Sequence, residues 1–447
     1  MQIELRPVYV VGGAWPLLPQ PDGQLEVITD QAATDSRIEA LGAYLREGLK
    51  GDATLLEPVV LRRSSDIARL RESALSADAL LVYVMGLMPL EKLLEIGLPI
   101  IAFSGQYTPM MGLYALPVEM REHYSNLTYA LDLQEIRDQV RLLLVKKRLG
   151  NTRMVLVGGP LTMDGHWEHL PDQEMVTRRL GAEVIAVSAA EFVAEVGRVE
   201  KEKAEAVARE WMSKAEAVAE PSESEIMQVA EVYLALHRVL KRTRAQAVAV
   251  GCLELMYICN LVPHCFALAT LRDEGIPAAC EADVSALLTM VILGYLGNKP
   301  AYMGNVVRAD PKENLVMISH GCSPAKMAGL DQPPKPYTLV QSHSAPPFSR
   351  VLEGGSGVTS YVDYMEDGQV ATIARIARDL DRIVAARAEI VGCRDTICDR
   401  TTLDLHVRDA REFFHQATGN HHVVVYGDYL DDLQGLCRLL DMRLVEV

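Results

Sequence analysis

The sequence lacks several features that would each assign it to a class of protein. It has eight cysteines but no Cys-x-x-Cys pair, which argues against a zinc ribbon or a thioredoxin-like centre. It has no excess of basic residues, since the formal net charge is −16, and this argues against a nucleic-acid surface. Its longest apolar stretch, residues 286–297, is too short to span a bilayer. We therefore expect a protein that binds neither nucleic acid nor a membrane.

Two further absences concern targeting and phosphate binding. The first residues, MQIELRPVYVVGG, contain neither the charged and apolar regions nor the cleavage site of a signal peptide. We therefore expect a cytoplasmic protein whose cysteines are reduced and buried as small hydrophobes. The pairs Gly12-Gly13 and Gly158-Gly159 do not complete a G-x-G-x-x-G fingerprint, and the chain has no phosphate-binding G-x-x-x-x-G-K-[ST] loop. These glycines indicate tight turns after strands rather than a nucleotide site.

What is present is an ordinary globular composition, with 49% hydrophobic and 23% charged residues. A chain of 447 residues is long enough for two or three domains. Short apolar runs at Val8–Val11, Ala79–Met85 and Pro99–Phe103 alternate with a helical pattern over Asp35–Leu49. This alternation predicts βαβ units on a parallel sheet, and we assign residues 1–150 to a first Rossmann-like domain.

The same alternation restarts near Arg153 and predicts a second Rossmann-like domain over residues 151–297. The expected strands are Met154–Val157, Glu183–Val187 and Ala247–Val250. A charged helix is expected over Val199–Glu220, ending at Pro221. A second helix, Ile226–Arg244, then follows a linker that also supplies an N-cap.

From about residue 298 the chain changes to short segments rich in Val, Ile, Thr and Tyr and separated by Gly and Pro. This pattern predicts a β-rich, mostly antiparallel domain over residues 298–447. The expected strands are Asn314–Ser319, Tyr337–Gln341, Val358–Asp363, Gln369–Ala374, Glu389–Val391 and His422–Tyr426.

Three short segments carry candidate chemistry. Glu281 and Asp283 precede an apolar helix, expected from Val284 to Leu296, where negative charge is favoured. Taken alone, the two carboxylates are better explained by helix capping than by a functional site. The segment Tyr302–Asn305 is expected to form a short turn. His421 and His422 begin a strand, so their side chains point to opposite faces and at most one of them serves a given pocket. Imidazole and carboxylate ligands together suit a divalent ion such as Mn²⁺.

These segments resemble the L-fucose isomerase family. The stretch CEADVSALLTMVILGYLGNKPAYMGN is similar to the centre of that family, in which a Glu opens a helix and a second acidic ligand follows 24 positions later. The corresponding residues here are Glu281 and Asn305. The segment GNHHVVVYGD is similar to the family's late histidine motif at His421, and the CRDT segment at Cys393 and DGQVATIARIARDL also resemble its C-terminal domain.

The resemblance implies an α/β fold with two Rossmann-like domains and a β-rich C-terminal domain, assembled as a trimer or hexamer. It implies aldose–ketose isomerisation of a small sugar through a cis-enediol, with Mn²⁺ polarising the carbonyl. Transferred to this chain, the metal ligands are Glu281, Asn305 and His421, and the catalytic positions are Glu281 and Asn305. His320 and Asn420 are assigned to substrate binding.

Two departures from the family pattern affect the predicted chemistry more than the fold. Asn305 replaces an acidic residue, and an amide oxygen can coordinate a cation but cannot exchange a proton at neutral pH. The sequence reads Ser-His320-Gly-Cys where many relatives read His-Cys-Gly. Candidate substitutes for the missing acid are Asp283, Asp310 and Glu254, although Asp283 is disfavoured because residues two apart on a helix do not share a face.

Three functions are consistent with these residues. The first is a metal-dependent isomerase or an epimerase that uses the same enediol. The second, which the loss of an acidic group at position 305 favours, is a sugar-binding homologue that does not isomerise its ligand. The third is carbon–carbon bond chemistry through the same metal enediolate.

Overall fold

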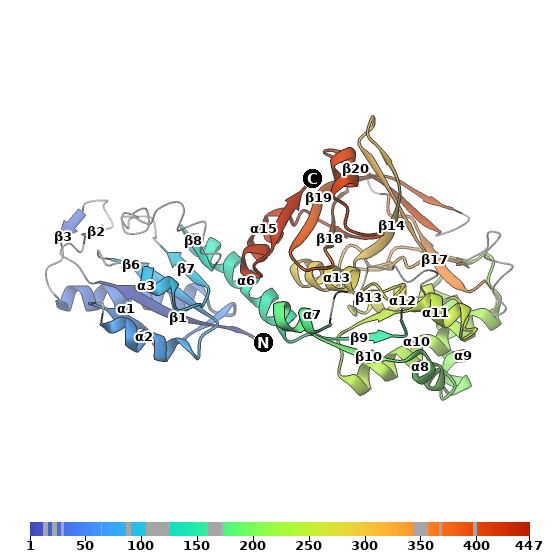
Figure 1. The fold of residues 1–447 in the computed structure, drawn as a ribbon, viewed down its shortest axis with the longest axis horizontal. Helices are drawn as coiled ribbons and strands as arrows, with labels where there is room; N and C mark the ends of the chain where they lie inside the picture. The colour runs from blue at the N-terminus through green and yellow to red at the C-terminus, as the bar shows by residue number, and fades with distance from the viewer. Residues whose placement is uncertain are drawn as a thin grey trace. The chain divides into compact units, whose positions relative to one another are not determined.

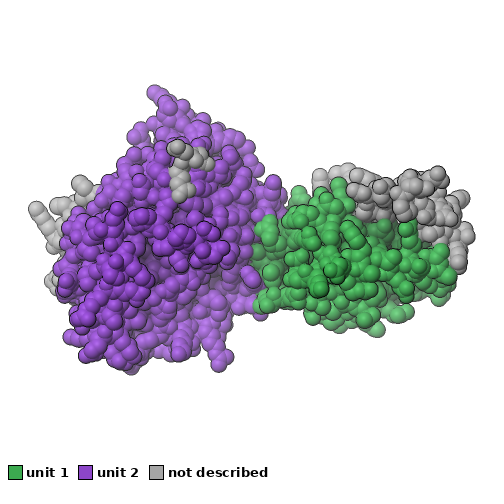
Figure 2. Space-filling model, turned by 180° about the vertical axis from the view of Figure 1, so that it is seen from behind, with its two compact units in different colours: residues 1–147, 438–441 green, residues 148–437, 442–447 purple. Residues whose placement is uncertain are grey.

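A computed structural model provides the structure of the protein. The residues that it describes are 1–11, 17–19, 25–27, 31–63, 65–85, 91–103, 126–159, 171, 173–342, 356–365, 369–396 and 400–447. They form two compact units, residues 1–147 with 438–441 and residues 148–437 with 442–447, which Figure 2 shows in different colours. The expected turn at Gly12-Gly13 lies outside the described residues.

The first unit contains a parallel sheet with the strand order β4-β1-β6-β7-β8, and β5 also pairs with β1. Strand β6 has the sequence ALLVYV and is buried along almost its whole length, as expected for a strand covered on both faces. The parallel sheet predicted for this region is confirmed. The elements are β1 (Ile3–Val10), β2 (Leu17–Pro19), β3 (Leu25–Val27), α1 (Gln31–Gly48), β4 (Ala53–Leu55), β5 (Val59–Leu61), α2 (Asp66–Ala74), β6 (Ala79–Val84), α3 (Glu91–Leu94), β7 (Ile100–Phe103), β8 (Leu127–Ala130) and α6 (Leu133–Gly150).

The second unit begins with another parallel sheet, with the order β10-β9-β12-β13 (Figure 1). This confirms the three strands expected after Arg153. The elements of this part are β9 (Arg153–Val157), α7 (Gln173–Leu180), β10 (Glu183–Val187), α8 (Ala189–Val196), α9 (Lys201–Lys214), β11 (Ala217–Val218), α10 (Glu223–Thr243), β12 (Ala247–Val250), α11 (Cys252–Tyr257), α12 (Cys265–Asp273), β13 (Ala278–Ala279) and α13 (Val284–Gly297).

Two boundaries in this part differ from the sequence-based expectation. The charged helix α9 ends at Lys214 rather than Glu220, because residues 217–218 pair with β16 as strand β11. Helix α10 begins at Glu223, three residues before the expected start. The Ser222 hydroxyl accepts the Glu225 N–H while the Glu225 carboxylate accepts the Ser222 N–H, and this capping box fixes the first turn.

The C-terminal part is β-rich and mostly antiparallel, as predicted. Six strands in the order β18-β21-β14-β15-β20-β19 close on themselves through the β18–β19 pair, and β22 adds to β19 in parallel. A separate sheet has the order β11-β16-β17. The elements are β14 (Tyr302–Asp310), β15 (Leu315–His320), β16 (Tyr337–Gln341), β17 (Val358–Val362), β18 (Val370–Ile376), β19 (Arg382–Asp395), β20 (Thr401–Val407), α14 (Ala410–Gln416), β21 (His421–Tyr426), α15 (Leu430–Leu439) and β22 (Arg443–Glu446).

Segment 302–305 is the start of β14 and not the expected turn. Its residues pair with β21 on one side, from Tyr302↔Val424 to Asn305↔His421, and Asn305 also pairs with Ser319 of β15. The apolar helix α13 packs against β12 and β13 and also against β18 and β21, so almost every one of its residues is buried. None of the described helices has both the length and the apolar character needed to cross a membrane. The division into three domains stays a prediction.

Candidate metal centre

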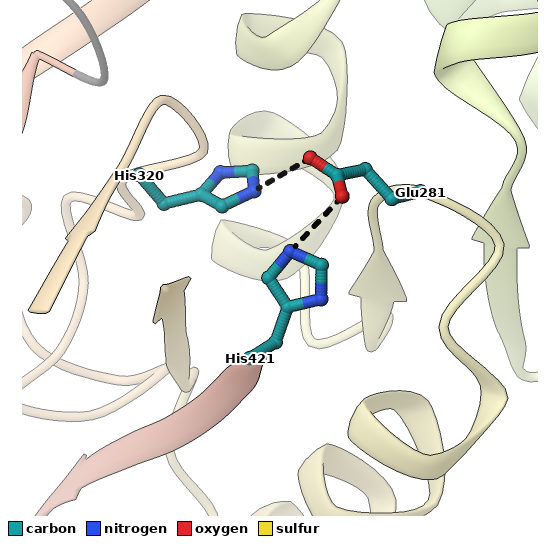
Figure 3. Close-up of side chains that lie close together, drawn as sticks. All are labelled: Glu281, His320 and His421. Atoms are coloured by element: carbon teal, nitrogen blue, oxygen red, sulfur yellow. Dashed lines mark ion pairs between the residues drawn. The ribbon is translucent and has the colours of Figure 1, made fainter. Parts of the chain in front are cut away.

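Three side chains from distant parts of the second unit converge on one point (Figure 3). Glu281 lies in the loop between β13 and α13, His320 ends β15 and His421 begins β21. One ligand atom from each lies within 4.8 Å of the other two. The two imidazoles flank the Glu281 carboxylate, with His421 Nε2 at 3.4 Å from Oε2 and His320 Nε2 at 4.0 Å from Oε1.

The cluster is largely shielded from solvent. The side chain of Glu281 is 18% exposed, whereas that of His320 is 4% exposed and that of His421 is fully buried. Burial alone raises the pKa of the Glu281 carboxyl, but the charges of His421 and His320 outweigh this effect and lower it. Glu281 is therefore a carboxylate at neutral pH, facing the two ring nitrogens.

The backbone that presents Glu281 is strained. Glu281 has φ = 55° and Ala282 has φ = 57°, a left-handed conformation that costs a non-glycine residue roughly 1–2 kcal/mol. Two hydrogen bonds hold the loop, one from Ala282 N–H to the carbonyl of Val250 (2.9 Å) and one from Asp283 N–H to that of Cys280 (3.1 Å). These contacts hold the strained backbone and so fix the direction in which the Glu281 side chain points.

Asp283 orients His421. It is the N-cap of α13, and its Oδ1 accepts the Ala286 N–H at 2.8 Å. Its Oδ2 lies 2.9 Å from His421 Nδ1 and accepts that nitrogen's proton, so the other ring nitrogen, Nε2, faces the Glu281 carboxylate. Metal-binding histidines commonly have such a carboxylate behind them. Burial lowers the pKa of His421, but Glu281 and Asp283 outweigh it and raise the pKa to about 9.

Arg375 of β18 completes this support. Its guanidinium makes two bonds to Asp283, Nη1 to Oδ2 at 2.8 Å and Nη2 to Oδ1 at 3.1 Å. It also donates to the backbone carbonyls of His421 (2.7 Å) and Thr418 (2.8 Å). Burial alone raises the pKa of Asp283, but Arg375 and His421 hold it below its usual range. Asp283 is therefore permanently ionised and is no substitute acid.

Asn305 lies beside the cluster on the closed sheet. Its ladder partners are His421 on β21 and Ser319 on β15, and side chains of directly paired residues share one face of a sheet. Its Oδ1 atom is buried and has no hydrogen-bond partner among the described residues. A buried amide oxygen in this state is free to accept a bond from a substrate or to bind a cation.

His320 has a defined tautomer. Its Nδ1 accepts the Gly321 N–H at 2.9 Å, so a neutral His320 carries its proton on Nε2, which faces Glu281. Binding a metal through Nε2 would require the other tautomer and the loss of that bond. This arrangement favours a proton-donating role for His320 over that of a ligand.

The two adjacent histidines face opposite ways, as strand alternation requires. His422 packs against the Phe413 ring, with a centroid separation of 5.1 Å, and burial lowers its pKa to about 3. Asn420, assigned to substrate binding, is exposed, and its backbone carbonyl accepts the Val306 N–H at 3.2 Å. The structure shows no contact between its side chain and the cluster among the described residues.

The two other candidate acids have structural roles. Asp310 is five residues further along β14 than Asn305, roughly 17 Å in an extended strand, and its Oδ1 accepts two N–H groups of the following turn. Glu254 accepts the Gly159 N–H at 2.6 Å and so fixes the turn after β9. The expectation that either of them replaces the missing acid is not supported by these contacts.

Sequence reasoning missed Arg375 and the positioning role of Asp283. One signal was available, because an arginine within the apolar strand VATIARI is unusual unless a buried acid pairs with it. The sequence disfavours Asp283 only if it belongs to the helix, where residues two apart do not share a face. As the N-cap it lies before the helical turn, where its side chain reaches both the helix backbone and a neighbouring strand.

The donor set of this cluster fits a divalent cation. One carboxylate, one imidazole whose Nε2 is oriented for coordination and one buried amide oxygen are nitrogen and oxygen ligands of the kind used for Mn²⁺ and similar ions. The geometry is compatible with such an ion and does not select one metal.

Comparison with known proteins gives one informative similarity. No family model matches the chain. The chain is 24% identical over 220 residues to the sulfoquinovose isomerase of Clostridium sp. (strain MSTE9), which covers 47% of this chain and 46% of that protein. The match thus spans about half the length of the curated relative. It supports a relationship to sugar isomerases in general.

Proposed function

We propose that the protein is a metal-dependent aldose–ketose isomerase acting on a small sugar or sugar derivative. The observation that carries this proposal is the Glu281 carboxylate held between two shielded imidazoles, one of them oriented by Asp283. The similarity to a sulfoquinovose isomerase supports the same reaction class. The resemblance to the L-fucose isomerase family and assembly as a trimer or hexamer belong to this proposal.

In the proposed site, Glu281, His421 and Asn305 would hold a divalent cation such as Mn²⁺. When bound, the cation supplies Lewis-acid polarisation of the sugar carbonyl. Asp283 and Arg375 keep the His421 ring in place, since they fix its Nδ1 proton and its backbone carbonyl.

The proton transfers are assigned to Glu281 and His320. The Glu281 carboxylate accepts the proton from the carbon next to the carbonyl, which gives the cis-enediol. Asn305 exchanges no proton at neutral pH, so it cannot serve as the second group. His320 can, because its Nε2 proton faces the same space as the Glu281 oxygens. It donates to the carbonyl oxygen as the enediol forms and recovers a proton from the neighbouring hydroxyl, while Glu281 returns its proton to the former carbonyl carbon.

The test is to incubate the metal-stripped protein with Mn²⁺ in D₂O and a panel of aldoses and ketoses that includes sulfoquinovose. Products and deuterium at C1 and C2 are followed by NMR. We expect a metal-dependent isomer carrying deuterium at one of these carbons. Glu281→Gln should abolish exchange, and Glu313→Gln, the same change at an exposed position, should leave it intact. Metal binding without any isomer or exchange would contradict the proposal.

A second candidate function rests on Asn305. A site that has an amide in place of the second acid and retains its imidazoles would suit a homologue that binds a sugar without isomerising it. In that case the panel would include a sugar that binds in a metal-dependent manner, measured by calorimetry, while its C1 and C2 protons stay unexchanged.

A further inference from the structure

A cavity of about 150 Å³ lies beside the C-terminal half of α13, within the second unit. Arg272 forms part of its lining and is 2% exposed, whereas Arg148 is exposed and marks the solvent side. Met290 and Leu330 contribute apolar surface. Because a water molecule occupies about 30 Å³ in the liquid, the cavity has room for a small polyatomic ligand.

The charge of Arg272 is incompletely compensated. Its Nε donates to the Ala278 carbonyl at 2.8 Å and its Nη1 to the Cys322 carbonyl. Among the described residues, its buried Nη2 has no hydrogen-bond partner and its guanidinium makes no direct ion pair. The nearby Asp273 carboxylate accepts the N–H groups of Ala325 and Lys326 instead. Asp273 therefore acts on Arg272 only through space, without a direct ion pair, and a bound anion would supply the hydrogen-bond partner that the buried Nη2 lacks.

The rest of the lining has the same sign of charge. Arg148 lies over the Tyr295 ring, 5.9 Å from its centroid, and Lys299 donates from Nζ to the Tyr426 carbonyl at 3.0 Å. Both side chains line the cavity together with Arg272, and none of the lining residues is acidic. Three cations around one cavity raise the local concentration of anions.

This cavity is separate from the candidate metal centre. Gly294, which lines it, follows Asp283 by eleven residues along α13, a distance of roughly 16 Å in an α-helix. No residue of the metal cluster contributes to the lining. The cavity and the metal cluster therefore have no residue in common.

We propose that this cavity is a binding site for a small oxyanion, a phosphate or sulfate group that pairs with Arg272 and is closed in by Arg148 and Lys299. Guanidinium groups bind such tetrahedral anions through paired N–H groups, and the free Nη2 of Arg272 provides a donor for one of them. The anion is either the free ion or the charged group of a small organic molecule whose apolar part contacts Met290 and Leu330.

The experiment is calorimetric titration of the full chain with inorganic phosphate, inorganic sulfate and glycerol phosphate at constant ionic strength, with chloride as reference. We expect saturable binding of phosphate or sulfate. Glycerol phosphate binding at least fivefold more tightly than inorganic phosphate would identify an organic anion as the ligand, and equal affinities would identify the free ion. Absence of saturable binding by all three probes would overturn the proposal and leave a water-filled cavity.

Substitutions of the lining residues test whether phosphate binds in this cavity. R148M/K299M should weaken phosphate binding at least tenfold, whereas R308M/K312M, which removes the same two charges from the β14–β15 hairpin, should change it less than twofold. Equal affinity in the two double variants would contradict the assignment. Arg272→Met should abolish binding if circular dichroism shows that the variant folds. Glu281→Gln should bind phosphate as the unmodified protein does, which separates this test from that of the proposed isomerase activity.

Discussion

Helix α13 has buried charges near both of its ends, and only the charge at the amino end has an ion-pair partner among the described residues. At the amino end, Asp283 contacts Arg375 and His421, so the negative charge is fully paired. At the carboxyl end, Arg272 has two carbonyl partners and no carboxylate in contact among the described residues. The position of Asp283 agrees with the helix dipole, which favours acids at the amino end of a helix. The pairing indicates a rigid support at one end, whereas the unpaired charge indicates a place for a ligand at the other.

The largest effect on stability is expected from breaking the ion pair between Asp283 and Arg375 at the amino end of α13. Arg375→Met leaves the Asp283 charge buried with one partner fewer, and the free energy of unfolding should fall by about 3–5 kcal/mol. Urea denaturation measures this. Arg394→Met removes an arginine from a partly exposed pair with Asp404 and should cost less than about 1 kcal/mol. A loss at Arg375 as small as that at Arg394 would show that the amino-end pair is not a rigid support.

The surroundings of Arg272, near the carboxyl end of α13, can be probed through the pH dependence of the free energy of unfolding. Burial raises the pKa of Asp273 to about 6, above its ordinary value of 3.8. Because the folded-state pKa is the higher one, this carboxyl favours the native state below pH 4, and that stability is lost as the pH rises through 6. Relative to Asp273→Asn, the free energy of unfolding should fall by about 2 kcal/mol between pH 4 and pH 7. Parallel pH profiles of the two proteins would show that Asp273 titrates normally.

A smaller effect is expected on metal affinity. Asp283→Asn removes the carboxylate that accepts the His421 Nδ1 proton, and Mn²⁺ affinity should fall about 10- to 100-fold in the folded protein. Competition with a fluorescent chelator measures this affinity. Asp310→Asn, an equivalent change in the hairpin turn, serves as the control and should leave the affinity within twofold. Unchanged affinity in Asp283→Asn would exclude His421 as a ligand.

The smallest predicted effect is a rise in the affinity for Mn²⁺. Asn305→Asp adds a negative charge next to His421 on the closed sheet, and Mn²⁺ affinity should rise by about tenfold, or about 1.4 kcal/mol. Asn420→Asp makes the same change at an exposed residue of the adjacent loop and should have no comparable effect. Weaker binding in Asn305→Asp would place the amide outside the ligand set.

The sequence predicts most of the architecture because the strands are either buried apolar runs or short β-branched segments between glycines. Val370–Ile376 and Tyr337–Gln341 follow that pattern closely. Strand β11 was missed because its two residues are exposed and become a strand only by pairing with β16. The start of β14 was interpreted as a turn for a similar reason, since its partners lie on β21 and β15, beyond the reach of any local pattern.

Only part of the candidate site could be predicted from the sequence. Glu281 and His421 were found through motif similarity, and the structure brings them together with His320. Arg375 and the function of Asp283 depend on contacts between residues that are far apart in the sequence, which periodicity does not report. The cavity near Arg272 was not expected either, because the arginine lies in an otherwise apolar helix and its unpaired nitrogen is a property of the packed chain.

The distance along the chain between Asp283 and His421 has a consequence during protein synthesis. The two residues are 138 positions apart, so at about 5–20 residues per second the ribosome makes His421 roughly 7–28 s after Asp283. Strand β21 begins at His421 and is therefore absent throughout that interval, and β18, which begins at Val370, is made only in its later part. Both strands cover α13 in the folded protein. Until these strands are made, the nascent chain exposes apolar side chains of α13 that the folded protein buries, and exposed apolar surface of this kind favours aggregation.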